Sequence, residues 1–187
     1  MSSQTAPAVQ GRTTWAIDPA HSSVEFSVRH LMITTVRGRF TGVAGTAVVD
    51  AAAPATSVVE VVIDAASIDT REAQRDAHLR SADFFDVERF PTLTFRSTRL
   101  EGAPDGPFTL TGDLTIHGVT RPVVLEVEPE GHITDAWGGF RSGFTARTTI
   151  RRSAFGLTWN QLLEAGGVTV SDEVKIALDI QLVQQAG

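Results

Sequence analysis

The chain has 187 residues, of which 42% are hydrophobic and 20% charged, a composition that fits one folded domain and excludes disordered, collagen-like and coiled-coil chains. The formal net charge of -6 argues against nucleic acid as a partner, because binding a phosphate backbone needs clustered lysine and arginine. The absence of cysteine excludes disulfides, thiolate metal sites and a cysteine nucleophile.

The N-terminal residues are small and polar, so we expect residues 1–12 to be disordered and residues 13–187 to form one domain. They contain no basic segment that leads into an apolar one, unlike a secretory signal, and we therefore expect a cytoplasmic protein. No run of about eighteen apolar residues occurs, so no transmembrane segment is expected.

Alternation of apolar and polar residues with a period of two fills most of the chain and predicts strands with one wet face. In chain order the apolar faces are Val24, Phe26 and Val28; Leu93 and Phe95; Leu110, Leu114 and Ile116; Val123, Leu125 and Val127; Phe140, Phe144, Ala146 and Ile150; and Val174, Ile176, Leu178, Ile180 and Leu182. Residues 36–50 resemble one long strand bent at its glycines. Residues 58–63 are apolar enough to be covered on both faces.

One region departs from this pattern. Residues 67–85 contain good helix formers, and we predict one short helix over Arg71 to Arg80 with Asp69 or Thr70 as its N-cap. A further single turn is expected after Phe155 and Gly156, within residues 159–163.

About eight or nine short strands, separated by glycine- and proline-rich turns, predict an all-β fold. A single antiparallel eight-stranded barrel with one short helix is the expected form, because closure removes exposed strand edges. Side chains can fill the interior of such a barrel or leave it open for one ligand. Periodicity does not separate these states, and by itself it favours the filled core.

The motifs of common enzyme classes do not occur: there is no nucleophile elbow, no zinc-protease helix motif and no glycine-rich nucleotide loop. Histidines at metal-binding spacing are also missing, so we expect no metal site. The histidines are His21, His30, His78, His117 and His132.

Two basic features remain as candidates for contact with a ligand. His30 continues the inward phase of Val28, and its imidazole either contacts a ligand at one end of the interior or bonds a loop carbonyl. Arg71, Arg75 and His78 follow one another at helical spacing. This basic stripe either meets an anionic head group or forms a solvated face paired with nearby carboxylates.

The aromatic residues point to an apolar interior. Ten phenylalanines and three tryptophans occur without a tyrosine, so few hydroxyl groups are available to orient a polar ligand.

A series of short motifs occurs in order along nearly the whole chain. They are the segments at 18–31 (DPAHSSVEFSVRHL), 36–40 (VRGRF), 67–70 (SIDT), 75–79 (RDAHL), 81–86 (SADFFD), Pro91, 118–123 (GVTRPV), 150–156 (IRRSAFG) and 170–176 (VSDEVKI). Together these motifs resemble the YceI-like family.

The resemblance implies a lipocalin-like barrel whose central tunnel holds a polyisoprenoid or related long-chain lipid, with no catalytic machinery and no cofactor. Many members of the family are periplasmic, whereas this chain begins without a signal sequence, which favours a cytoplasmic lipid binder or carrier. Strand phase gives the expected lipid-binding residues as Phe26, Val28, Phe40, Phe95, Leu114, Ile116, Leu125, Phe144, Ile150, Ile176 and Leu178, with Phe155 and Trp159 closing one end. The head-group candidates are His30, Arg71, Arg75 and His78.

The leading hypothesis is therefore non-enzymatic binding, sequestration or transport of a long-chain isoprenoid in the barrel interior. One alternative is an enzyme at the barrel mouth that acts on a lipid head group, with His30, His78 and nearby carboxylates as acid and base. Another is an interaction module with a closed barrel, which would form a homodimer through an edge or outer face.

Overall fold

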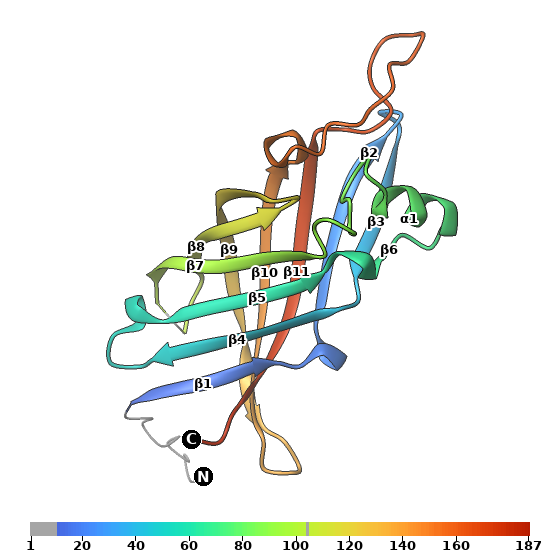
Figure 1. Ribbon diagram of the computed structural model, residues 1–187. Helices are drawn as coiled ribbons and strands as arrows, with labels where there is room; N and C mark the ends of the chain where they lie inside the picture. The colour runs from blue at the N-terminus through green and yellow to red at the C-terminus, as the bar shows by residue number, and fades with distance from the viewer. Residues whose placement is uncertain (1–10, 104) are drawn as a thin grey trace.

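The computed structural model describes residues 11–103 and 105–187, and its strands form one antiparallel sheet (Figure 1). The strands are β1 (Arg12–Ile17), β2 (Ser23–His30), β3 (Thr34–Phe40), β4 (Val43–Asp50), β5 (Val58–Asp64), β6 (Ile68–Asp69), β7 (Thr92–Gly102), β8 (Phe108–Ile116), β9 (Val119–Thr134), β10 (Phe140–Arg151) and β11 (Glu173–Gln184). The helices are α1 (Ala73–Arg80) and the 3-10 turns η1 (Pro19–His21), η2 (Pro54–Thr56), η3 (Ala65–Ser67) and η4 (Arg152–Phe155). The predicted segment 1–12 lies outside the described residues, apart from Gly11 and Arg12.

Eight of these strands close into a barrel, in the order β1-β4-β5-β7-β8-β9-β10-β11, because β1 also pairs with the end of β11. The closing register places Trp15 opposite Gln184 and Ile17 opposite Leu182. The earlier part of β11 pairs instead with β2, which leads on to β3 and β6. The prediction of a closed eight-stranded antiparallel barrel with one helix is confirmed, with β2, β3 and β6 as additional strands.

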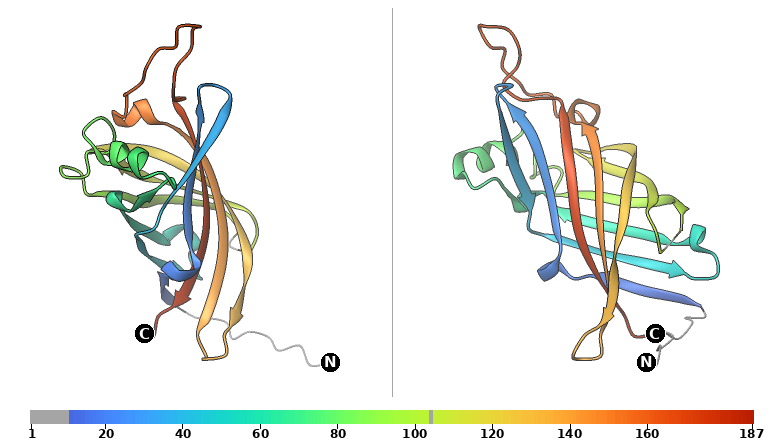
Figure 2. Two further views of the ribbon diagram at one scale, coloured as in Figure 1. Left: turned by 90° about the vertical axis from the view of Figure 1, so that its right-hand side faces the viewer. Right: turned by 180° about the vertical axis from the view of Figure 1, so that it is seen from behind.

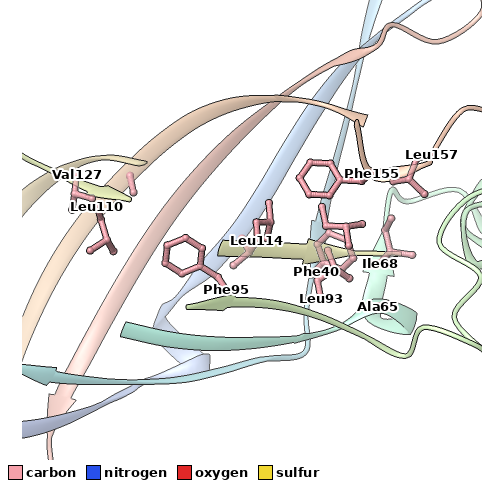
Figure 3. Close-up of a cluster of buried hydrophobic side chains, with 13 residues drawn as sticks. Phe40, Ala65, Ile68, Leu93, Phe95, Leu110, Leu114, Val127, Phe155 and Leu157 are labelled. Atoms are coloured by element: carbon pink, nitrogen blue, oxygen red, sulfur yellow. The ribbon is translucent and has the colours of Figure 1, made fainter. Parts of the chain in front are cut away.

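The barrel is flattened into two layers whose strands cross steeply (Figures 1 and 2). Strands β1, β4, β5, β7 and β8 form one layer, and β9, β10, β11, β2 and β3 form the other. The apolar faces of both layers point inward and carry the buried cluster drawn in Figure 3, in which Leu110 and Val127 lie at one end and Ile68 and Leu157 at the other.

The segment predicted as one long strand over residues 36–50 is two strands, β3 and β4, separated at Thr41 and Gly42. Gly38 is needed inside β3 because a Cβ at this position would overlap the ring of Phe26. The glycines therefore mark a turn and a close packing contact as well as curvature.

Residues 58–63 are not covered on both faces. Val59, Val61 and Ile63 point inward, whereas Val62 is 47% exposed. Glu60 also faces outward, where it forms an ion pair with Arg96 of β7. The strand has the ordinary alternation, and a valine on its wet face concealed that pattern.

The helix begins later than predicted, at Ala73, and its N-cap is Glu72 rather than Asp69 or Thr70. The Glu72 carboxylate accepts hydrogen bonds from the backbone nitrogens of Gln74 (3.2 Å) and Arg75 (2.6 Å). Asp69 is held in β6 opposite Arg39, so the chain can turn into a helix only after it.

The predicted turn within residues 159–163 is also wrong. The helical turn of this region is η4, which ends before Gly156, and residues 156–163 contain no helix. Gly156 adopts a left-handed conformation with φ 77°, which ends the turn. None of the described helices has the length and apolar character needed to cross a bilayer.

Candidate binding cavity

The space between the two layers contains a cavity of about 690 Å³. It extends from the β4–β5 connection, at Asp50 and Pro54, to the region of α1 and residues 157–170. Cavities that hold small organic ligands measure about 300 to 1,000 Å³. The filled core favoured by periodicity alone is therefore wrong, and the barrel interior has room for a ligand.

Most residues that line the cavity are aliphatic or aromatic and come from the inward faces of the strands. Twelve of the thirteen residues expected to bind lipid line it: Phe26, Val28, Phe40, Phe95, Leu114, Ile116, Leu125, Phe144, Ile150, Trp159, Ile176 and Leu178. That these side chains contact a lipid stays a prediction. Strands β4 and β5 add lining residues that were not selected, including Ala47, Val59, Val61 and Ile63, although their alternation was present in the sequence.

Phe155 does not line the cavity, in contrast to its expected role at one end. It is 2% exposed and packs in the buried cluster beside Leu157 (Figure 3). Strand phase gave no guidance here, because Phe155 belongs to the turn η4 rather than to a strand.

The polar groups of the cavity gather where α1 meets it. Arg75 Nε donates to Thr70 Oγ1 and Arg75 Nη2 to the Thr70 carbonyl oxygen, each at 2.8 Å. The buried carboxylate of Asp76 accepts from the Thr70 backbone nitrogen at 2.9 Å and from its hydroxyl at 2.5 Å. These bonds fix the guanidinium of Arg75, an exposed residue that also lines the cavity, through its Nε and Nη2 atoms.

His78 lies beside Arg75 on the cavity wall, within an aromatic cluster. Its ring packs edge-on against Phe84 and Trp159, with centroids 5.1 and 4.8 Å apart. His78 Nε2 lies 2.8 Å from Asp83 Oδ2, so the histidine is held by a carboxylate on its outer side. Asp83 thus pairs with His78, one of the two histidines that the alternative enzyme hypothesis names as acid or base.

The remaining head-group candidates, His30 and Arg71, differ in whether they line the cavity. His30 lines the same end of the cavity, where its backbone bridges to Val170. Arg71 does not line it: this exposed residue precedes the helix with φ 62° and lies outside the cavity. The basic stripe predicted at helical spacing is wrong at its first member, because the helix begins two residues after Arg71.

A buried arginine that sequence reasoning did not select lies at this end as well. Arg152 is 7% exposed, and its guanidinium donates to four backbone carbonyl oxygens: Leu157 and Trp159 (2.8 Å each), Ser171 (2.9 Å) and Val170 (3.2 Å). Burial lowers the pKa of Arg152, and the nearby charge of Asp172 opposes that effect. Arg152 thus fastens residues 157–171 beside the cavity while its charge has no carboxylate bonded to it.

The opposite end of the cavity has polar groups that are satisfied locally. The Asp50 carboxylate accepts from the backbone nitrogens of Ala52 (3.0 Å) and Ala53 (3.1 Å) and lies 3.4 Å from Arg12 Nε. The hydrogen bond from Ala53 is the main cause that holds the pKa of Asp50 below its ordinary value. The Asp50 carboxylate is therefore satisfied by its own loop, whereas the charged donors that line the cavity, Arg75 and Arg152, are at the α1 end.

At the β9–β10 hairpin end of the barrel, a network of charged side chains joins β10 to the hairpin and to the start of η1. We call this the closed end. Arg141 bridges Asp18 (2.7 Å) and Asp135 (2.6 Å), and the ring of Phe140 packs on Trp15 at 5.6 Å. Hydrogen bonds from His21 and then Arg141 lower the pKa of Asp18 from 3.8 to about 2. Phe140, predicted on the inward face of its strand, belongs to this closure and does not line the cavity.

The described residues contain no group of three or more histidine, aspartate or glutamate side chains placed to hold a metal ion. The site is thus an apolar cavity with a cluster of polar donors at one end.

Known proteins share the sequence pattern and the architecture of this chain. Residues 15–182 match the YceI-like domain family. A UPF0312 protein of Shewanella baltica is 39% identical over 154 residues, 81% of each chain. The crystal structure of BcnA from Burkholderia cenocepacia has a TM-score of 0.76 and 25% identity, covering 88% of this chain and 98% of that one.

A polyisoprenoid-binding domain from Saccharophagus degradans has a TM-score of 0.68 and covers 91% of this chain and 98% of its own, at 16% identity. At that identity the likeness shows a shared fold. None of these three relatives carries the name of an enzyme. The family match covers most of the chain, and this protein belongs to the YceI-like family.

Proposed function

We propose that this protein binds a long-chain isoprenoid or related amphiphilic lipid in its barrel, without catalysis, and so sequesters or carries it. The observation that carries the proposal is the apolar cavity of about 690 Å³ that continues from the β4–β5 connection to α1. The name of the structural relative from Saccharophagus degradans, a polyisoprenoid-binding domain, supports the same ligand class.

Burial of the tail can supply the affinity. A tail of about 30 carbons, at about 0.3 kcal/mol per heavy atom for a large ligand, contributes about 9 kcal/mol. This value corresponds to a dissociation constant below about 1 μM. Apolar lining is thus sufficient for binding, and the polar groups at one end set the orientation.

In this proposal the polar head lies at the α1 end, next to Arg75 and His78. Thr70 engages Arg75 Nε and Nη2, and in this proposal Nη1 donates to the head group. Arg152 adds a positive charge at this end whose hydrogen bonds go to carbonyl oxygens, with Asp172 nearby but not bonded to it. A head group that accepts hydrogen bonds, such as a phosphate, quinone or hydroxyl, fits these donors.

The first test is the lipid content of the purified protein. We expect mass spectrometry of its organic extract to show a stoichiometric long-chain lipid that is absent from a mock purification. Phe144→Arg should abolish retention, because it places a charge on the cavity wall where Phe144 packs against Phe108. An empty extract that stays empty after incubation with long-chain isoprenoids would overturn the proposal.

Val62→Arg is the matched control for this substitution. Val62 is 47% exposed on the outer face of β5, so the same charge should leave retention unchanged. Circular dichroism checks that both variants fold. Equal retention in wild type and a folded Phe144→Arg variant would place the lipid elsewhere.

The orientation of the lipid is tested with two added ligands, decaprenyl phosphate and the hydrocarbon squalene. Arg75→Gln should weaken binding of the phosphate about tenfold, which is the loss of one charge-assisted hydrogen bond, and leave squalene binding unchanged. Arg71→Gln is the control, because Arg71 lies outside the cavity. Equal losses for both ligands in Arg75→Gln would indicate a purely structural role for Arg75.

A further inference from the structure

Four large apolar side chains are exposed at one end of the molecule, on two neighbouring loops. Leu31, Met32 and Ile33 in the β2–β3 turn are 38%, 53% and 72% exposed, and Leu162 in the loop between η4 and β11 is 88% exposed. The two loops are joined at their bases, where the Leu31 backbone nitrogen donates to the Thr169 carbonyl oxygen at 2.8 Å. Both project beyond the barrel (Figures 1 and 2). We call these four side chains the apolar tips.

The backbone of the β2–β3 turn disfavours the residues found there. Leu31 and Met32 have φ 51° and 62°, and the Ile33 nitrogen donates to the His30 carbonyl oxygen at 3.1 Å. Two central residues with positive φ are typical of a type I′ turn, in which asparagine and glycine are favoured. Leucine and methionine adopt this conformation at a cost. Leu31 and Met32 are therefore disfavoured both by the backbone conformation and by the exposure of their apolar side chains to water. Their presence despite these costs indicates a function.

The apolar tips flank the polar end of the cavity. His30, which lines that end, directly precedes Leu31. Trp159 and Thr169 also line it, and they lie on either side of Leu162 in the sequence. A surface that covers the tips would consequently lie next to the head-group end of the cavity.

We propose that the apolar tips insert into the interfacial layer of a lipid bilayer and dock the cavity end against the membrane. This inference rests on the proposed lipid-binding function, for which a membrane is the source or destination of the ligand. Two narrow tips suit a deformable lipid layer better than a protein, because a stable protein interface needs about 800 Å² on each partner. Exposed apolar side chains that are grouped, as on these two adjoining loops, mark contact sites for proteins or membranes.

The charges beside the tips predict which membranes bind. Arg29, which donates to the Met32 carbonyl oxygen at 3.1 Å, is close to the β2–β3 turn, while Glu164 lies in the other loop. These opposite charges give the tips no strong preference for anionic lipid. Docking therefore depends on apolar burial, and it should persist at high salt, where attraction between exposed charges is screened.

The test is flotation of the full chain with phosphatidylcholine vesicles, and with vesicles that also contain phosphatidylglycerol. Wild type should float with both, at low and high salt. The double substitution Ile33→Asp with Leu162→Asp should reduce the bound fraction about tenfold or more, because charged residues are costly in the interfacial layer. The control is Trp137→Asp: Trp137 is 90% exposed on the β9–β10 hairpin at the opposite end, and its loss should change nothing.

A second variant separates insertion from a structural role of the turn. Leu31→Asn with Met32→Gly supplies the residues that this backbone favours, so the variant should unfold at a higher temperature than wild type and yet bind vesicles less. If Leu31 and Met32 instead stabilise the fold, this variant should unfold at a lower temperature than wild type.

The proposal is overturned if wild type does not float, if the aspartate variant floats as wild type does, or if Trp137→Asp has the larger effect. It is also overturned if the tips prove to join two copies of the chain, seen as a dimer that the aspartate variant converts to monomer without any vesicle binding. Mass spectrometry of the organic extract reports separately on lipid binding in the barrel. Flotation without an extractable lipid would therefore reject the proposed cargo and retain the docking surface.

Discussion

Strand β10 has Arg141 near its start and is followed directly by Arg152, the first residue of η4, and these two arginines are held in different ways. At the hairpin end, Arg141 lies between the carboxylates of Asp18 and Asp135, so its charge is compensated where it lies. At the other end, Arg152 is bound by four carbonyl oxygens of one irregular loop, without a bonded carboxylate. Figure 1 shows the two regions at opposite ends of the barrel.

The difference separates a closed end from an end suited to a ligand. Ion pairs and the packing of Phe140 on Trp15 close the strands at Arg141, which does not line the cavity. At Arg152 the loop of residues 157–171 is instead held through hydrogen bonds to carbonyl oxygens and by its backbone bonds to β2, and the positive charge borders the cavity. A charge without a bonded carboxylate is costly to bury, even with the charge of Asp172 nearby, so its retention beside an apolar cavity suits a ligand with an electron-rich head group.

Arg152→Met should give the largest effect, because it removes four hydrogen bonds to carbonyl oxygens. The Val170 oxygen keeps the Asn160 side-chain amide as a donor at 2.7 Å, whereas the other three oxygens lose theirs. We expect a loss of about 3 kcal/mol in the free energy of unfolding, measured by urea denaturation. Amide hydrogen exchange should accelerate most in residues 157–171, while the amides of β9 to β11 stay comparatively protected.

Two matched variants test this interpretation of Arg152. Arg152→Lys keeps the charge and can bind some of the carbonyl oxygens, so it should recover part of the lost stability. Arg151→Met changes the exposed neighbour and should alter the free energy of unfolding by less than about 0.5 kcal/mol. If Arg152→Met costs no more than Arg151→Met, the loop is held by something other than the guanidinium.

The sequence predicted the barrel and much of the cavity wall because strand phase can be read one residue at a time. Ile176 and Leu178, for example, share one face of β11, with Lys175 and Asp179 on the other face, and line the cavity as expected. The same alternation located the inward faces of β2, β7, β8 and β9. Closure of the barrel followed from the number of short strands, since closure removes exposed edges.

The rest of the site lies where strand phase gives no information. Arg152 binds backbone carbonyl oxygens, which every residue has, so its partners leave no mark in the sequence. Arg71 and Phe155 were misplaced because the helix starts at Ala73 and the turn η4 ends at Phe155. The open interior depends on the summed volumes of the side chains from every strand, which no single segment contains.

A substitution at the closed end, which contains Asp18 and Arg141, should lower the free energy of unfolding by less than Arg152→Met does. This loss should depend on pH. The pKa of Asp18 is lowered to about 2, first by its hydrogen bond with His21 and next by Arg141. An aspartate whose pKa is lower in the folded state adds stability above its unfolded pKa, near 3.8, and loses it as the pH falls toward 2. Asp18→Asn should therefore cost about 1 to 2 kcal/mol at pH 7 and less at pH 2, with lipid retention unchanged at pH 7.

The control for this comparison is Glu128→Gln, which removes an exposed carboxylate 3.8 Å from Arg147. It should change the free energy of unfolding by less than about 0.5 kcal/mol at either pH, because exposed ion pairs contribute little. A cost for Asp18→Asn that is the same at pH 7 and pH 2 would show that Asp18 acts through its fit to the η1 turn rather than its charge. Loss of bound lipid in this variant at pH 7 would show that the two ends are coupled, because Asp18 is remote from the proposed head-group donors. Two results together would separate the end that closes the barrel from the end that receives the ligand. Asp18→Asn would retain its bound lipid at pH 7, and Arg152→Lys would show altered binding of decaprenyl phosphate.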